Sequence, residues 1–168
     1  MSHVTHTFEP WFDAQSRVLV LGTMPSPKSR EEGFYYAHRQ NRFWRVLPAL
    51  YDLPPLTGDI AAQKQFLTEH HIALWDVLAS CDIRGASDAS IQNPVPNNMN
   101  KILSCAPIRT IFTTGVKAYR LYQKYCLPQC GVPAVMLPST SPANCAVSLE
   151  QLCVSYAVIR QAAEGRKE

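Results

Sequence analysis

The chain has 168 residues, of which 46% are hydrophobic and 17% are charged. This composition excludes a disordered chain, and the length favours one domain, so we expect residues 1–168 to fold as a single unit. The formal net charge of +3 permits a nucleic-acid partner without demanding one, because a local basic patch counts for more than the total.

The first half of the chain contains two apolar strands and two amphipathic helices. A strand is predicted over Ser16–Gly22, and a helix over Asn41–Leu50, where apolar residues recur at helical spacing. A second helix over Asp59–His70 and a second strand over Ile72–Leu78 follow. From residue 79 to Pro96 the chain is rich in Ser, Asp, Asn, Gly and Pro, which predicts an irregular loop.

The second half repeats this alternation. Asn97 or Asn98 is expected to cap a helix that ends near Cys105. The later elements are a strand over Arg109–Thr114, a helix over Val116–Tyr125, a strand over Pro133–Leu137, a loop over Pro138–Pro142 and a long helix over Ala143–Glu164. Such alternation predicts the α/β class, as a three-layer α/β/α sandwich around a central, mostly parallel four-stranded sheet. In these folds ligands bind outside the carboxyl ends of the strands.

The six cysteines do not form a metal-binding pattern. Only Cys126 and Cys130 are close, and no second pair or Cys/His set accompanies them, so we expect packing residues, no metal and no other cofactor. The chain starts without a secretory signal, and no apolar run approaches the roughly 20 residues of a membrane-spanning helix. We therefore expect a cytoplasmic protein with reduced cysteines and no membrane partner.

The segment from Leu21 to Leu47 carries the strongest functional signal. GTMPSP directly follows the first strand, and Phe34, Tyr35 and Tyr36 come after it as consecutive aromatic residues. Such a loop leaves backbone N–H groups unpaired beside flat rings, which suits the binding of a nucleobase. Packing on the core explains any one ring equally well, but three consecutive rings cannot all face inward.

Common site motifs are absent from this loop. GTMPS is neither a phosphate-binding GxxxxGK[ST] loop nor a GxSxG nucleophile elbow, and the chain has no GxGxxG fingerprint. Among the carboxylates, Asp76 stands out because it lies in an apolar strand, where it must be hydrogen-bonded or lie at the strand end. A site role and a purely structural role are both open for it.

A second polar loop, LPSTSPAN, follows the last predicted strand. It offers the hydroxyls of Ser139, Thr140 and Ser141, and we expect the N-terminus of the last helix beside them to bind phosphate through free N–H groups. The alternative is helix capping by one of these hydroxyls or by Asn144. Since both loops follow strands of one sheet, they are expected to meet in one site.

Together, GTMPS, FYYAHRQNRFW and LPSTSPAN resemble motifs of the uracil-DNA glycosylase superfamily. The nearest branch is the hypoxanthine (deoxyinosine) DNA glycosylases, close to the mismatch-specific uracil/thymine glycosylases. The resemblance covers almost the whole chain and implies a monofunctional hydrolase for DNA repair, which removes a flipped deaminated base, chiefly hypoxanthine, and leaves an abasic site. It also implies double-stranded DNA with a damaged or mismatched base as the partner of a monomeric protein.

The resemblance assigns roles to individual residues. Asn41 would be the catalytic residue, which orients the attacking water or bonds to the base. The base-binding residues would be Gly22, Thr23, Met24, Pro25, Tyr36 and His38, with Tyr36 as the stacking ring. The DNA-binding residues would be Ser26, Ser29, Ser139, Thr140, Ser141 and Pro142. For His38, a proton source near the base and a structural role are alternatives.

Two departures from the superfamily pattern narrow the choice of branch that this chain resembles. Many members have a catalytic Asp or Asn where this chain has Met24, and some have a His where it has Leu137. The first departure excludes the usual uracil-specific mechanism and shifts the chemistry to Asn41. Two alternatives stay open, a glycosylase for uracil or G:T/G:U mismatches, and a DNA-binding relative without catalysis.

Basic residues crowd the first motif: Lys28, Arg30, Arg39, Arg42 and Arg45. Their positive charge predicts phosphate contacts and an affinity for DNA that falls with salt. Each one taken singly is equally well explained as a solvated surface residue. If the protein is bacterial and acts on DNA, we expect it to be associated with the nucleoid.

Overall fold

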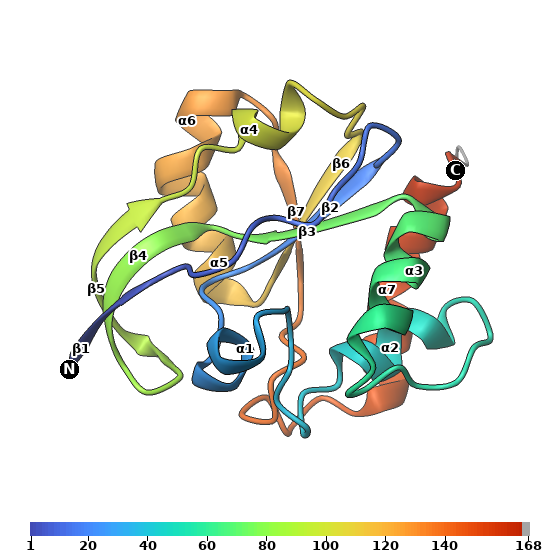
Figure 1. Cartoon of the computed structure of the whole chain (residues 1–168), viewed down its shortest axis with the longest axis horizontal. Helices are drawn as coiled ribbons and strands as arrows, with labels where there is room; N and C mark the ends of the chain where they lie inside the picture. Colours follow the sequence, from blue (N-terminus) through green and yellow to red (C-terminus); the bar gives the residue numbers. More distant parts are fainter. Residues whose placement is uncertain (166–168) are drawn as a thin grey trace.

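Four parallel strands form the centre of the molecule, a computed structural model that describes residues 1–165 (Figure 1). In spatial order they are β3 (Ile72–Asp76), β2 (Val18–Gly22), β6 (Thr110–Thr114) and β7 (Ala134–Leu137). Every neighbouring pair is parallel. β2 and β3 are buried along their whole length, which explains their continuous apolar sequences.

Helices cover both faces of this sheet, which confirms the expected three-layer α/β/α sandwich. In Figure 1, the helices to the right of the sheet are α2 (Phe43–Ala49), α3 (Ile60–His70) and α7 (Leu149–Ala163). The helices to its left are α4 (Asn100–Leu103), α5 (Val116–Leu121) and α6 (Leu127–Cys130), the last two joined by the π-helical turn η1 (Tyr122–Cys126). None of the helices within residues 1–165 is long and apolar enough to cross a membrane.

The first loop contains a short helix that its sequence did not suggest, α1 (Pro27–Glu32). Ser26 caps it, because the Ser26 Oγ accepts a hydrogen bond from the Ser29 N–H (3.1 Å). Gly33, at φ 75°, ends it in the left-handed conformation that glycine adopts most easily. These caps fix the chain between the end of β2 and the aromatic residues that follow.

A second, antiparallel sheet stands where an irregular loop was expected. Its strands are β1 (Ser2–Thr5), β4 (Leu78–Arg84) and β5 (Ser87–Pro96), in that order. The expectation of irregular structure up to Pro96 is wrong, because the residues taken as loop signals serve the sheet. Gly85, at φ 60°, makes the turn of the β4–β5 hairpin. The prolines lie in the edge strand β5, where a missing N–H need not interrupt the sheet.

The last helix begins at Leu149 and not at Ala143 as predicted. Ser148 and Gln151 form a capping box, in which each side chain accepts the other residue's backbone N–H. Residues 138–148 are therefore an irregular loop. The predicted phosphate site at a helix N-terminus beside Ser139 is wrong, since no helix begins there.

Candidate active site

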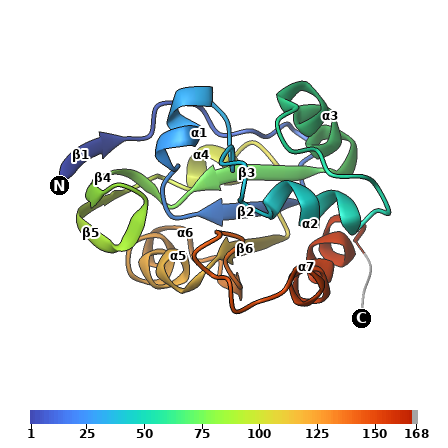
Figure 2. The ribbon, with the colours of Figure 1, turned by 90° about the horizontal axis from the view of Figure 1, so that it is seen from below.

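The two loops meet in one pocket at the carboxyl ends of the central strands, the lower end of Figure 1, which Figure 2 views directly. The pocket is lined by these predicted site residues: Gly22, Thr23, Met24, Pro25, Ser26, Ser29, Tyr36, Asn41, Ser139 and Ser141. The meeting of segments far apart in the chain is what the parallel topology predicts.

Gly22, the last residue of β2, allows a carboxylate to approach the backbone closely. A Cβ at this position would lie 2.5 Å from Asp76 Oδ1 and 3.2 Å from the Tyr36 hydroxyl oxygen. Any larger residue would therefore displace the Asp76 side chain, which lies at the end of the neighbouring strand β3. Glycine is required at this position because a side chain would clash with Asp76, and not because the backbone adopts a positive φ.

The backbone after Gly22 offers unused hydrogen-bond donors. The carbonyls of Gly22 and Thr23 accept the N–H groups of Val77 (2.8 Å) and Leu78 (3.1 Å), which fixes the loop to the β3–β4 connection. Within residues 1–165, no hydrogen bond uses the N–H of Thr23 or of Met24. This arrangement agrees with the unpaired donors predicted for the loop.

The three consecutive aromatic residues divide between the core and the pocket. Phe34 and Tyr35 are buried in the core, Tyr36 is half-buried, and both tyrosines line the pocket. Tyr36 has a φ of 54° and stacks on Phe43, with 3.8 Å between ring centroids and 13° between planes. Because Phe43 covers one face of the Tyr36 ring, a planar ligand could stack only on the opposite face.

Asn41 presents an amide donor to the pocket. Its Oδ1 accepts hydrogen bonds from the Phe43 N–H (2.9 Å) and from the Thr140 hydroxyl (2.8 Å). A backbone N–H can only donate, so the atom that it contacts is the oxygen, and the Nδ2 group is the free end of the amide. No partner for Nδ2 exists in the described part of the chain, and Asn41 lines the pocket. Its chemistry is therefore donation of a hydrogen bond.

Thr140 acts differently from the phosphate contact expected of it. It is 1% exposed, and its hydroxyl is directed to Asn41. Pro142, also expected to bind DNA, is exposed on the same loop and is not part of the pocket lining. Thr140 therefore orients Asn41, a role that the chain spacing could not reveal.

Arg42 joins the second loop to the first. Its guanidinium donates to the carbonyls of Asn144 (2.9 Å), Ser141 (3.4 Å) and Val147, and its backbone N–H donates to the Thr140 carbonyl (3.0 Å). These bonds hold the carbonyls of residues 140–147 in an irregular path, which explains why α7 starts late. Arg42 is thus a structural residue and is not available to phosphate.

His38 does not lie in the base pocket, contrary to its predicted role. It is exposed and lines a separate hollow with Arg39, Gln40, Arg45 and Thr57. Its Nδ1 accepts the Gln40 N–H (3.1 Å). The structure therefore does not bring His38 into this pocket, and its role as a base-binding residue or proton source stays a prediction.

The five basic residues of the first motif separate into two groups. Lys28 pairs with Glu32 (3.0 Å), Arg30 donates to the Pro25 carbonyl (2.7 Å), and Arg42 holds the second loop. Arg39 and Arg45 are exposed and make no side-chain hydrogen bond or ion pair within residues 1–165. These two are the cations left for DNA phosphates.

Two carboxylates border the pocket, Asp76 and Asp88, and the second was not predicted. Asp88 lies on the β4–β5 hairpin, which contributes Ile83, Gly85 and Ala86 to the same wall. The residue is exposed overall, but its Oδ2 accepts from the buried Thr23 hydroxyl (3.3 Å). Desolvation raises the pKa of the Asp88 carboxyl, and the charge of Asp76 raises it further.

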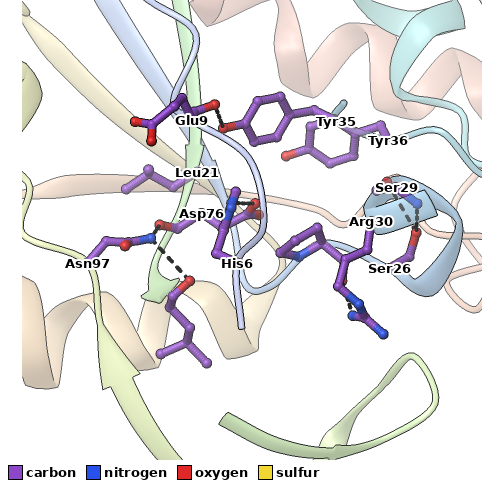
Figure 3. A network of polar contacts seen from close by, with 12 residues as sticks. His6, Glu9, Leu21, Ser26, Ser29, Arg30, Tyr35, Tyr36, Asp76 and Asn97 are labelled. Carbon is purple, nitrogen blue, oxygen red and sulfur yellow. Dashed lines mark hydrogen bonds and ion pairs between the residues drawn. The ribbon is translucent and has the colours of Figure 1, made fainter. Parts of the chain in front are cut away.

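Asp76 belongs to the polar network drawn in Figure 3. Its Oδ2 lies 2.8 Å from His6 Nε2, and both side chains are almost fully buried. Its backbone carbonyl accepts from Asn97 Nδ2 (2.9 Å), which also donates to the Leu78 carbonyl (3.1 Å). The buried carboxylate is thus hydrogen-bonded and also lies at a strand end, so both of the arrangements expected for a carboxylate in an apolar strand are present.

Among residues 1–165, no group of three or more His, Cys, Asp or Glu side chains is arranged to hold a metal ion. Cys126 is buried, and all six cysteines are free thiols. The chemistry available in the pocket is that of amide, hydroxyl, carboxylate and backbone N–H groups.

A family model described as "Uracil DNA glycosylase superfamily" matches residues 9–157, which include both loops and all four central strands. The chain belongs to the uracil DNA glycosylase superfamily. It is 31% identical over 140 residues to the hypoxanthine DNA glycosylase of Methanosarcina acetivorans, covering 82% of this chain and 86% of that protein. A hypoxanthine DNA glycosylase of Methanosarcina barkeri is 28% identical over 112 residues, covering 66% and 71%.

The fold also matches a solved member of the superfamily. The solution NMR structure of a uracil DNA glycosylase homologue from M. acetivorans superposes with a TM-score of 0.76 at 29% identity. The match covers 92% of this chain and 96% of that one. The resemblance of the sequence motifs and the resemblance of the fold therefore lead to the same superfamily.

Proposed function

We propose that this protein is a DNA repair glycosylase that removes hypoxanthine from deoxyinosine in double-stranded DNA and leaves an abasic site. The two Methanosarcina relatives, which bear the name hypoxanthine DNA glycosylase, support this substrate. The observation that carries the proposal is that Asn41 and Asp76 line the same pocket, where Asn41 offers a hydrogen-bond donor and Asp76 offers an acceptor.

This pair of groups matches the edge of a deaminated base. Deamination converts an amino group beside an unprotonated ring nitrogen into a carbonyl beside a ring N–H. Asn41 Nδ2 can donate to the new carbonyl, and the Asp76 carboxylate can accept from the new N–H. Adenine presents the opposite pattern, which would leave both groups unpaired, and sites of this kind discriminate strongly.

Catalysis would rest on extrusion of the base and on stabilisation of the charge that develops. Flipping the nucleotide costs a few kcal/mol, and stacking on the free face of Tyr36 would return about 1–3 kcal/mol. As the C1′–N9 bond breaks, its electron pair moves to the base while water adds to C1′ and loses a proton, which the departing base takes up. Donors from Asn41 Nδ2 and from the N–H groups of Thr23 and Met24 would stabilise the anionic base.

The reaction would be hydrolysis without strand cleavage. A bifunctional glycosylase needs an amine nucleophile, and no lysine among residues 1–165 lines the pocket. Lys28 is the lysine of the first motif, and its amino group pairs with Glu32. Water is therefore the nucleophile we assign.

The proposal is tested with duplexes that carry one deoxyinosine opposite each normal base, followed by alkaline cleavage of abasic sites. We expect cleavage only after alkali, and none with Asn41→Ala. Duplexes with deoxyuridine or a G:T mismatch test the closest alternative, because uracil and thymine share the carbonyl and N–H edge. If every duplex stays intact while the protein still binds DNA, the non-catalytic alternative replaces this proposal.

A further inference from the structure

His6 contacts the pocket residue Asp76 from a segment that precedes residues 9–157, the part matched by the superfamily model. β1 pairs with β4 in the register Thr5 to Ser80, and the His6 N–H donates to the Ala79 carbonyl (2.7 Å). Strand pairing therefore places the His6 side chain over the end of β3. Its position depends on the second sheet and not on the central one.

The contact between His6 and Asp76 is buried on both sides. His6 Nε2 lies 2.8 Å from Asp76 Oδ2, and the side chains are 4% and 5% exposed. The imidazole packs against the rings of Phe8 (4.7 Å between centroids) and Tyr35 (6.0 Å). Its Nδ1 is buried and has no hydrogen-bond partner within the described residues. The hydrogen bond of the imidazole is therefore the one that Nε2 donates to the Asp76 carboxylate.

This bond determines how Asp76 meets the pocket. With Oδ2 bound to His6, the carboxylate cannot rotate freely, and Oδ1 lies against Gly22 at the pocket wall. No donor among residues 1–165 is bonded to Oδ1. Figure 3 shows the two side chains meeting between the strand that carries Asp76 and the segment that carries His6.

We propose that His6 is a positioning residue that holds the Asp76 carboxylate by Oδ2, with Oδ1 directed at the ring N–H of the bound base, and so sets the selectivity of the pocket. The inference rests on the proposed function. The bond at Oδ2 fixes the orientation of the carboxylate, so that Oδ1 faces the pocket wall as a hydrogen-bond acceptor. A carboxylate free to rotate would lose the directed acceptor that distinguishes hypoxanthine from adenine.

Other titratable groups face this pair from the elements around it. They are Glu9 on the same segment, Tyr35 and Tyr36 after α1, and Asp88 on the hairpin. Glu9 is exposed and paired with Lys101 (2.8 Å). Burial raises the pKa of both tyrosines, so they stay neutral in the range of interest. Asp88 is therefore the second carboxylate of this pocket whose effect must be separated from that of Asp76, and Asp88→Asn serves for this.

The test compares His6→Phe, which keeps ring packing but removes the donor, with His6→Gln, which keeps an N–H donor. In single-turnover excision of hypoxanthine, we expect His6→Phe to lose about 10- to 100-fold near neutral pH. His6→Gln should recover most of the loss, because its side-chain amide can still donate to Asp76. The matched control is His3→Phe, since Nδ1 of His3 on β1 lies 2.8 Å from Asp82 on β4 but the His3 side chain is exposed.

Two further measurements separate positioning from packing. If His6 acts through Asp76, the double variant with Asp76→Ala is no slower than Asp76→Ala alone. Carboxyl NMR should also find that added hypoxanthine shifts the Asp76 signal in the native chain and shifts it less in His6→Phe, and this readout needs no activity. An equal shift in both chains together with additive losses would overturn the inference. A native chain that never excises hypoxanthine would overturn the proposed function instead. If His6→Phe does not fold, the Asp76 signal in His6→Gln decides: a native-like response to hypoxanthine is expected, and a lost response contradicts the inference.

Discussion

The hydroxyl of Thr140 donates a hydrogen bond to the side-chain oxygen of Asn41 across the two loops (2.8 Å). Together with the Phe43 N–H, it occupies the acceptor end of the amide and leaves the donor end for a ligand. A residue expected to bind phosphate therefore determines the orientation of the residue expected to do the chemistry.

Replacing Thr140 with valine should weaken both stability and activity. The substitution keeps the shape of the side chain but removes the donor, which costs about 1 kcal/mol of unfolding free energy and frees the Asn41 amide to rotate. Urea unfolding and single-turnover excision measure the two effects. Thr113→Val is the matched control, because Thr113 is equally buried and its hydroxyl has no partner within residues 1–165.

Asn41→Asp should separate catalysis from folding. Aspartate keeps the oxygen that accepts from Phe43 and Thr140 but replaces the Nδ2 donor with a second acceptor. We expect excision to fall about 10²- to 10³-fold, as for the loss of a preorganised donor, with little change in melting temperature. Retained activity would mean that Asn41 acts as an acceptor toward water.

Gly22→Ala should abolish selective excision through a steric effect on Asp76. The added Cβ would lie 2.5 Å from Oδ1, so the carboxylate must move away from the pocket wall. We expect a less stable protein with a deformed pocket. The double variant with Asp76→Ala should regain stability by thermal melting but not activity, and a Gly22→Ala chain with normal excision would contradict the assigned role of Oδ1.

Removing Arg39 and Arg45 should weaken DNA binding without changing the chemistry. They are the two cations of the first motif without a partner within residues 1–165, and they line the hollow that contains His38. If each contacts one phosphate, alanine substitution lowers the slope of log K against log salt by about 0.9 per residue. Fluorescence anisotropy on undamaged duplex measures this slope. Arg120→Ala on α5 is the control, and an equal effect there would favour general surface charge.

Asp88→Asn should raise stability at neutral pH. The pKa of this carboxyl is higher in the folded chain than in the unfolded one, so the folded state holds its proton more tightly. Ionisation of Asp88 then lowers the free energy of unfolding as the pH rises through the pKa of the folded chain. The difference in stability between the native chain and the variant disappears at a pH well below the ordinary pKa of Asp. Thermal melts of both chains at acid and neutral pH should show the variant more stable only at neutral pH.

The parts of this structure that the sequence predicted depend on local pattern. Buried strands such as Val18–Gly22 are continuous apolar runs, and parallel topology then brings the loops that follow them together. Periodicity failed for the β4–β5 hairpin, whose outward faces are polar and whose Gly and Pro mimic loop signals. The contacts of His6 with Asp76 and of Thr140 with Asn41 join residues far apart in the chain, so no spacing rule could find them.

The path of residues 138–148 is imposed by a side chain from outside that segment. Arg42 holds its carbonyls, so the loop owes its shape to a guanidinium that lies before α2. The loop is therefore not a transferable module. Grafting Ser139–Val147 onto another scaffold would carry the sequence without the shape, and exchange between relatives must move Arg42 along with it.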